Sequence, residues 1–378
     1  MNQIYLDGHS TTPLAPEALE AMAPWWHAQA GNPHSPHLRG MMASSAVEAA
    51  RMDIARLVNA DSQELFFTSG ATEANNIAVR GTALAALDGG SPRRQIIVSA
   101  IEHKSVLASA HSLERMGFEI VEAPVSRNGV VDLDRLEPLI GEGTLLVSVM
   151  AVNNEVGTIQ PVSTVVNLAR TAGALVHVDA AQAAGKVPLD FSDFDLASLS
   201  SHKFYGPMGI GALFVSSASP LRPFALQFGG GQEAGIRPGT VATPLAVGFG
   251  VAASLANERL LTDSAHQKAM ACTLLDELAS LQTKFIENVP QKYRVPGSIS
   301  IRFPGHNAMS LVSRAGGRLA ISEGSACTSG QIDASHVLSA MGYTLEAAAE
   351  TVRIYCSRFT TGIEVAEAAR ILSDLVRD

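Results

Sequence analysis

Short apolar stretches alternate with helical patterns from residue 64 to residue 215, and this alternation restricts the fold more than any other feature. The apolar stretches are continuous, which is typical of strands buried on both faces of a parallel sheet. Helices between them would cover both faces. We predict an α/β fold with a mostly parallel, seven-stranded sheet. The predicted strands are 64–68, 95–99, 119–123, 145–150, 174–178, 196–199 and 211–215.

Helical patterns lie between these strands and on either side of them. They are predicted at 16–26, 43–58, 73–87, 105–116, 132–139 and 162–172, with a loop rich in Gly and Pro at 31–40. After residue 242 the alternation ends, and a long helical region at 244–285 leads to shorter αβ units. We predict a large α/β domain at 14–255 and a smaller α+β domain formed by 1–13 and 256–378.

Composition restricts the partners and the compartment. The 378 residues carry a net charge of −9, which argues against direct binding to nucleic acid. Three widely spaced cysteines suggest neither a disulfide framework nor a zinc site and fit a reducing compartment. The N-terminus lacks a basic region followed by an apolar run, and the most apolar segment, 244–256, is too short to span a bilayer. We predict a cytoplasmic protein that does not contact a membrane.

Lys203 lies between two apolar runs and has no charged neighbour in the sequence. Partial desolvation of a lysine makes its neutral amine available, and neutral amines form Schiff bases, most often with pyridoxal phosphate. The alternative is a lysine that simply extends past a strand end into water. Asp179 follows the strand at 174–178 and adds the carboxylate that keeps a pyridinium nitrogen protonated.

Other strand ends carry further groups that a phosphorylated pyridine requires. The strand at 64–68 leads through a glycine turn to a helix start, where backbone N–H groups and Thr72 form a phosphate cup. A plain helix cap by Ser69 or Thr72 is the alternative there. His103 could stack on the ring and move protons, or could be structural. Asn154 could reach a ring hydroxyl or a substrate carboxylate.

Six motifs carry a resemblance to a known family. They are Thr-Ser-Gly-Ala-Thr-Glu-Ala-Asn-Asn (68–76), Asn-Asn-Glu-Val-Gly-Thr-Ile-Gln-Pro (153–161), His-Val-Asp-Ala-Ala-Gln (177–182), Ser-His-Lys-Phe-Tyr-Gly-Pro (201–207), Gly-Gly-Gly-Gln-Glu (229–233) and Arg-Pro-Gly-Thr (237–240). From residue 5 to residue 361 the chain resembles the pyridoxal-phosphate-dependent cysteine desulfurases. These belong to the class V, fold-type I aminotransferases, so the resemblance implies a fold-type I transferase fold and pyridoxal 5′-phosphate as cofactor.

The resemblance also implies roles for the matching residues. Lys203 resembles the Schiff-base lysine, His103 the ring-stacking acid–base histidine and Asp179 the pyridinium partner. Thr240 corresponds to a residue that the family donates to the partner subunit's phosphate, which implies a homodimer. The remaining residues that the resemblance places at the cofactor are Ala71, Thr72, Asn154, Gln182, Ser200 and His202. The residues that it places at the substrate are Asn32, Asn154 and Arg353.

Cys327 lies in Gly-Ser-Ala-Cys-Thr-Ser-Gly (324–330), whose small and polar residues predict an exposed loop. A thiol on such a tether could reach the cofactor, and the segment resembles the catalytic loop of the longer-loop desulfurases. Cys272 and Cys356 lie among apolar residues and are predicted to be packed. Arg353 could hold an α-carboxylate through two parallel hydrogen bonds, with a surface ion pair as the alternative.

The implied function is that of a cysteine desulfurase. It would remove sulfur from L-cysteine through a ketimine of the cofactor, giving L-alanine and a persulfide on Cys327. The implied sulfur acceptor is an iron–sulfur scaffold or a tRNA-thiolation enzyme. No resident metal is expected, apart from Cys327 as a transient iron–sulfur ligand. Alternatives are another class V enzyme, such as a selenocysteine lyase or an aminotransferase, and an acceptor-dependent sulfur-relay subunit.

This chain departs from the family pattern at a few positions. His34 stands where the family usually has Ser, and Tyr355-Cys356-Ser357 replaces a small residue, a hydrophobe and a glycine. Glu323 stands four residues before Cys327, where Ser is common. These departures concern access to the site and reaction rate rather than the cofactor.

Overall fold

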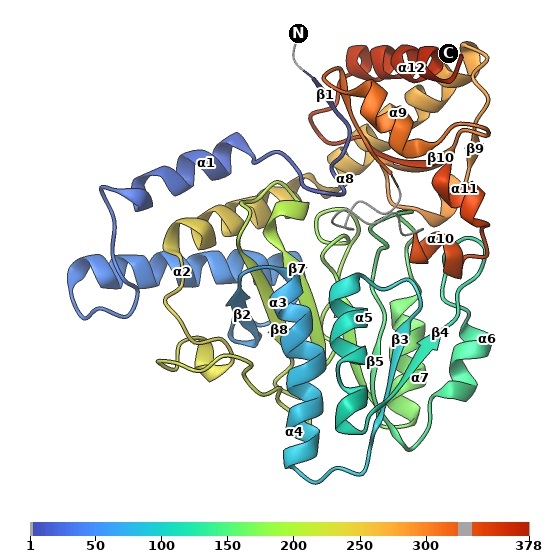
Figure 1. The fold of residues 1–378 in the computed structure, drawn as a ribbon. Coiled ribbons are helices and arrows are strands. Elements are labelled where there is room, and N and C mark those ends of the chain that lie inside the picture. Colours follow the sequence, from blue (N-terminus) through green and yellow to red (C-terminus); the bar gives the residue numbers. More distant parts are fainter. Residues whose placement is uncertain (1–2, 324–334, 378) are drawn as a thin grey trace.

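The computed structural model describes residues 3–323 and 335–377 (Figure 1). A seven-stranded sheet of order β2-β8-β7-β6-β5-β3-β4 forms the larger part of the molecule. Its strands are β2 (Leu65–Thr68), β3 (Gln95–Ser99), β4 (Glu119–Ala123), β5 (Thr144–Ser148), β6 (Leu175–Asp179), β7 (Leu196–Ser200) and β8 (Gly211–Val215). Only β8 runs antiparallel to its neighbours in this sheet, β2 and β7. The predicted seven-stranded, mostly parallel sheet is confirmed.

Helices cover both faces of this sheet because successive strand residues point to opposite sides. Ile96 and Val98 pack against one helical layer, whereas Ile97 packs against the other. The first layer contains α3 (Ala71–Asn76), α4 (Thr82–Asp88) and α5 (Lys104–His111). The second layer contains α2 (Leu38–Leu57), α6 (Leu133–Leu136), α7 (Val162–Thr171) and the first half of α8 (Thr243–Ser280). Helix α1 (Pro16–Met22) packs on α8, which also packs on α2, at the side of the molecule (Figure 1).

Three predicted helix boundaries were wrong, one of them the end of the long helical region, which lies at Ser280 instead of 285. Helix α2 begins at Leu38, five residues before the predicted start, because the His37 side chain accepts a hydrogen bond from the Gly40 N–H at 3.2 Å and caps the helix. Gly40 suits this first turn, since a Cβ there would lie 2.2 Å from the Ser35 carbonyl oxygen. Helix α5 ends at His111 instead of 116, and a separate 3₁₀ turn follows.

The smaller part of the molecule contains a second sheet of order β12-β13-β10-β9 and the parallel pair β1-β11. Its elements are β1 (Ile4–Tyr5), β9 (Ile286–Glu287), β10 (Ser298–Arg302), β11 (Leu319–Ala320), β12 (Ser322–Glu323), β13 (Thr351–Tyr355), α9 (Ala308–Ala315), α10 (His336–Ala340), α11 (Leu345–Ala349) and α12 (Gly362–Arg377). Helix α8 contributes Ala256 to the first core but Ala271 to the second. The domain division at 255/256 stays a prediction, and this change of core within α8 supports it.

The N-terminal segment joins the two parts of the molecule. The Leu6 carbonyl accepts a hydrogen bond from the Tyr355 N–H, and the Thr12 N–H donates to the His202 carbonyl. Gly8 allows this close passage, because a Cβ there would lie 2.4 Å from the Tyr355 ring. The segment therefore lies between β13 and the Lys203 loop. In the described residues, no helix is both long and apolar enough to cross a membrane.

Candidate active site

A cavity of about 440 Å³ lies where the loops after β2, β3, β5, β6 and β7 meet β13. Ligands of open parallel sheets bind at this carboxyl end of the strands. The predicted residues that line the cavity are Ala71, Thr72, His103, Asn154, Asp179, Gln182, Ser200, His202, Lys203 and Arg353. Asn32 and Thr240 are exposed and lie outside this lining. Cys327 lies outside the described residues.

The glycine turn before α3 forms one end of the cavity. Gly70 is the N-cap at φ 152° and provides no side-chain cap, so the alternative of a cap by Ser69 or Thr72 does not occur. The Ser69 N–H instead donates to the Glu73 carboxylate at 2.5 Å. Strand β8 approaches so closely that a Cβ on Gly211 would lie 2.7 Å from the Gly70 Cα. The first helical turn thus directs backbone N–H groups into the cavity beside Thr72, which suits a phosphate.

Carboxylate and amide groups occupy the middle of the cavity. Asp179 accepts hydrogen bonds from the Asn75 side-chain amide at 2.8 Å and from the Ala181 N–H at 3.0 Å. The side-chain oxygen of Asn154 is buried and has no hydrogen-bond partner among the described residues. A buried amide oxygen without a partner is costly unless a ligand satisfies it. The hydroxyl of a pyridoxal ring is such a ligand, so these residues fit pyridoxal phosphate.

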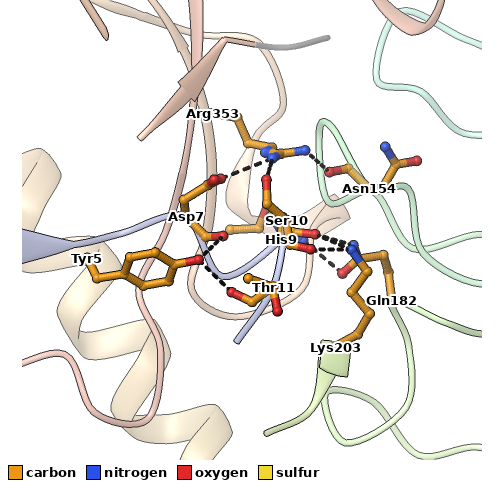
Figure 2. Close-up of polar contacts among 10 residues, drawn as sticks. Tyr5, Asp7, His9, Ser10, Thr11, Asn154, Gln182, Lys203 and Arg353 are labelled. Carbon is orange, nitrogen blue, oxygen red and sulfur yellow. Dashed lines mark hydrogen bonds and ion pairs between the residues drawn. The ribbon is translucent and has the colours of Figure 1, made fainter. Parts of the chain in front are cut away.

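The Lys203 amine points toward the N-terminal segment (Figure 2). Its Nζ donates to the His9 carbonyl at 2.9 Å and to the Ser10 carbonyl at 2.7 Å. Next to it, the His202 Nδ1 lies 3.0 Å from the Thr11 hydroxyl. Burial, followed by the charges of Lys203 and Lys186, lowers the pKa of His202 to about 4, so this imidazole is neutral and can only hydrogen-bond.

Arg353 brings a buried guanidinium to the same cavity from β13 (Figure 2). Its Nη2 contacts the Asp7 carboxylate at 3.0 Å and the Ser10 hydroxyl at 2.5 Å, and its Nη1 donates to the Asn154 carbonyl at 3.0 Å. The residue is only 4% exposed, so the alternative of a surface ion pair is wrong. Asp7 balances the charge and fixes the orientation of the guanidinium beside the cavity.

Gln182 is held from three directions. Its Nε2 donates to the His9 carbonyl at 2.8 Å, and its Oε1 lies 3.0 Å from the His9 Nδ1 and accepts from the Lys186 amine at 2.7 Å. Tyr355 packs on this group, with its ring 4.6 Å from the His9 ring and 5.2 Å from the Lys186 Nζ. Burial lowers the pKa of both His9 and Lys186 well below their usual values. Tyr355, which stands where the family usually has a small residue, therefore packs against the buried His9 and Lys186 that hold Gln182.

Glu102 precedes His103 and is completely buried. Its Oε1 accepts the Met150 N–H at 2.6 Å, and its Oε2 has no partner among the described residues. Burial, with the Asp179 charge, raises the pKa of Glu102 well above its usual value. Above about pH 4 the unfolded chain releases the Glu102 proton, whereas the folded protein keeps it. The free energy of unfolding therefore falls as the pH rises from about 4 toward the raised pKa of folded Glu102.

We expect Glu102→Gln to raise the free energy of unfolding at pH 7 by roughly 1 kcal/mol or more, because glutamine needs no proton to stay neutral. At about pH 3 the gain should disappear, since both folded and unfolded Glu102 are then protonated. Urea denaturation of the cofactor-free protein at the two pH values measures the difference. An equal effect at both would show that Glu102 is ionised in the folded state.

The two described cysteines do not line the cavity. Cys356 is packed in the second core as predicted, and burial raises the pKa of its thiol to about 12. Cys272 is half-buried, so the prediction that it is packed was wrong; its Sγ accepts a hydrogen bond from Gln291 at 3.2 Å. Its helix face turns partly to solvent at this position. Among the described residues, no three His, Cys, Asp or Glu side chains could hold a metal ion together.

Comparison with known proteins decides the family. A profile for the class V aminotransferases matches residues 4–365, which is nearly the whole chain. The chain belongs to the class V aminotransferase family. The resemblance found in the motifs is thereby confirmed.

Within the class V family the chain is similar to cysteine desulfurases. It is 42% identical over 372 residues to the cysteine desulfurase IscS of Rickettsia bellii, and the match covers 98% of this chain and 90% of that protein. A solved structure described as a NifS-like protein is 34% identical, with a TM-score of 0.91 over 99% of both chains. A second, described as SspA in complex with cysteine, is 35% identical, with a TM-score of 0.83 over 95% of this chain and 100% of that one. The predicted fold class is confirmed.

Sequence reasoning missed the N-terminal contribution to this class V site. His9 and Ser10 line the cavity, and Asp7 pairs with Arg353. The polar run at 7–12 after an apolar start was the available signal. This polar run does not reveal which residue pairs with Asp7, because Asp7 and Arg353 are 346 positions apart in the sequence.

Proposed function

We propose that the protein is a cysteine desulfurase that converts L-cysteine to L-alanine and leaves the sulfur as a persulfide on Cys327. One observation carries the proposal: an amine, an imidazole, a carboxylate and a guanidinium from four different elements line one cavity. These are Lys203, His103, Asp179 and Arg353. The solved relative described as a complex with cysteine supports that substrate.

The residues of the cavity would hold pyridoxal 5′-phosphate. Lys203 would bind it covalently, Asp179 would pair with its ring nitrogen, and His103 would cover its ring. The phosphate would lie at the first turn of α3, with Ala71, Thr72, Ser200 and His202 as ligands, and Asn154 and Gln182 would meet the ring hydroxyl. Bound there, the cofactor supplies the electron sink that makes cleavage of a carbon–sulfur bond feasible.

The protein's own groups then bind and orient the substrate. Arg353 would take the α-carboxylate in place of part of its contact with Ser10, while Asp7 keeps the guanidinium in position. The Lys203 amine, oriented by two carbonyl oxygens, would accept and return protons at Nζ. Overall, cysteine and the Cys327 thiol give alanine and a Cys327 persulfide, so atoms and electrons balance without another reactant.

The described residues on either side of Cys327 support its role. Glu323 ends β12, in which Ser322 lies opposite Arg353. Ser335 donates to the buried Glu155 carboxylate beside Asn154 at 2.5 Å. Glu323 and Ser335, the described residues nearest to Cys327 on either side, therefore both adjoin residues next to the cavity.

We also propose a homodimer in which Thr240 reaches the partner subunit's phosphate site. Thr240 is exposed and lies outside its own cavity. Large apolar side chains are exposed nearby in the sequence and on α2, with Phe228 93% and Leu38 73% exposed. Such side chains on a soluble chain suit an interface. Asn32, exposed before α2, stays a predicted substrate contact.

The further proposals concern delivery of the sulfur. An acceptor protein, either an iron–sulfur scaffold or a tRNA-thiolation enzyme, would take the persulfide, with Cys327 as a transient iron–sulfur ligand in the first case. A cytoplasmic location fits the absence of a disulfide between the two described cysteines.

Product analysis tests the proposed function. The purified protein, loaded with pyridoxal phosphate and given L-cysteine and a thiol reductant, should form alanine and sulfide in equal amounts. A keto acid would instead indicate an aminotransferase. Turnover of selenocysteine alone would indicate a selenocysteine lyase, and turnover only after an acceptor protein is added would indicate a relay subunit.

A further inference from the structure

A chain of buried polar groups connects Asp179 to His103 beside the cavity. Asn75 of α3 donates from its Nδ2 to the Asp179 carboxylate at 2.8 Å and to the Ser105 hydroxyl at 2.8 Å. The Ser105 hydroxyl lies 2.8 Å from the His103 Nδ1. The groups that lead to His103 in this hydrogen-bond chain are buried: Asn75 is fully buried, and Asp179 and Ser105 are 5% and 9% exposed. These three side chains are therefore shielded from bulk solvent.

The direction of each hydrogen bond follows from the groups themselves. An ionised carboxylate only accepts, so the Asn75 amide nitrogen faces Asp179. The second N–H of the Asn75 amide donates to the Ser105 hydroxyl oxygen. The hydroxyl hydrogen of Ser105 is then available to donate to the His103 Nδ1. The Ser105 backbone N–H also donates to the same Nδ1 at 3.1 Å. Two donors meet at one ring nitrogen, so that nitrogen carries no proton.

We propose that Ser105 is a positioning residue that holds His103 as the tautomer protonated at Nε2, through a hydrogen-bond chain anchored on Asp179. His103 then presents a donor to whatever lies in the cavity. If the ring took up a second proton, at Nδ1, that proton would face the hydrogen of the Ser105 backbone N–H. A hydroxyl group could rotate to avoid this repulsion, but a backbone N–H cannot. Because the ring cannot readily accept, acceptance of the substrate proton falls to the Lys203 amine. This inference rests on the proposed function, in which Lys203 accepts the proton, and it assigns His103 the role of a hydrogen-bond donor.

The electrostatic surroundings agree with a neutral His103. Burial lowers the pKa of His103 most. The Asp179 charge opposes this effect, while the charges of Lys203, His336 and Lys104 add to it. These groups come from β6, the Lys203 loop, α10 and α5, the elements packed around the ring. Hydrogen bonding thus favours an unprotonated Nδ1, and burial favours a neutral ring.

Nitrogen NMR of the full-length protein tests the tautomer directly. With imidazole-¹⁵N-labelled histidine, the His103 signals are identified by their loss in His103→Gln. In the cofactor-free and the loaded wild-type protein, we expect an unprotonated Nδ1 and a protonated Nε2 at neutral and alkaline pH. A protonated Nδ1 in the wild type overturns the proposal, whatever the variants show.

Three variants separate the hydroxyl from general packing. Ser105→Ala should raise the protonation constant of His103 about five-fold, because one hydrogen bond to its unprotonated form is lost. Ser105→Thr keeps the hydroxyl and should restore the wild-type titration. Ser109→Ala removes a buried hydroxyl from the same helix, which bonds only to the Val106 carbonyl in the described chain, and should titrate like the wild type.

Equal titrations of Ser105→Ala and Ser109→Ala would refute the role of Ser105. Cysteine turnover is measured on the same samples. A wild type that makes alanine with the proton at Nδ1 refutes only this inference. A wild type with the expected tautomer that makes no alanine refutes the proposed function and leaves the tautomer assignment in place.

Discussion

Replacing Lys203 with alanine should lower alanine formation from L-cysteine by at least about a thousand-fold and should remove the visible absorbance of the bound cofactor. The loss is large because no other lysine amine lines the cavity in the described part of the chain. The absorbance spectrum of the purified variant, followed by the alanine assay, measures both effects.

Lys186 provides the matched control for this experiment. It is also a buried lysine, and burial lowers the pKa of its amine well below the usual value. Its Nζ, however, bonds to the Gln182 side chain instead of lining the cavity. Lys186→Met should therefore keep the visible absorbance. If Lys203→Ala keeps it too, Lys203 is not the covalent attachment point.

Replacing Cys327 with serine should abolish sulfide and alanine release while the visible absorbance of the cofactor stays. A serine oxygen cannot take up sulfur from cysteine, whereas the cofactor contacts are made by other residues. Addition of L-cysteine to the variant should still change the absorbance spectrum, which shows that substrate binds. The two assays together separate loss of sulfur acceptance from loss of the cofactor.

The other two cysteines serve as controls. Cys356 is buried with a pKa of about 12, and Cys272 lies against Gln291 outside the cavity. Cys272→Ser should retain wild-type turnover, because neither Cys272 nor its hydrogen-bond partner Gln291 lines the cavity. If Cys327→Ser retains full turnover, sulfur leaves the substrate without a persulfide on this residue.

Local sequence was sufficient for the large sheet and for the loops at its edge. Strands such as β3 are continuous apolar runs because both faces are covered, and parallel strands bring the loops after them together. For this reason His103, Asn154, Asp179 and Lys203 could be assigned to one site before their positions were known, and the structure places all four at one cavity.

Contacts between distant segments could not be predicted in this way. The carbonyls of His9 and Ser10 that hold Lys203 are backbone groups, which any residue type supplies. The tautomer of His103 depends on a serine two residues away and on Asn75 from another helix, and no periodicity links them. The start of α2 was missed because a histidine caps it, which is not one of the preferred capping residues.

Peptide mapping of the loaded protein after a brief exposure to L-cysteine, without reductant, tests the central proposal most directly. The account predicts that the peptide containing Cys327 gains the mass of one sulfur atom, in proportion to the alanine released, while the peptides containing Cys272 and Cys356 do not. Alanine released with no added sulfur on Cys327, or with the sulfur on either other cysteine, would contradict it.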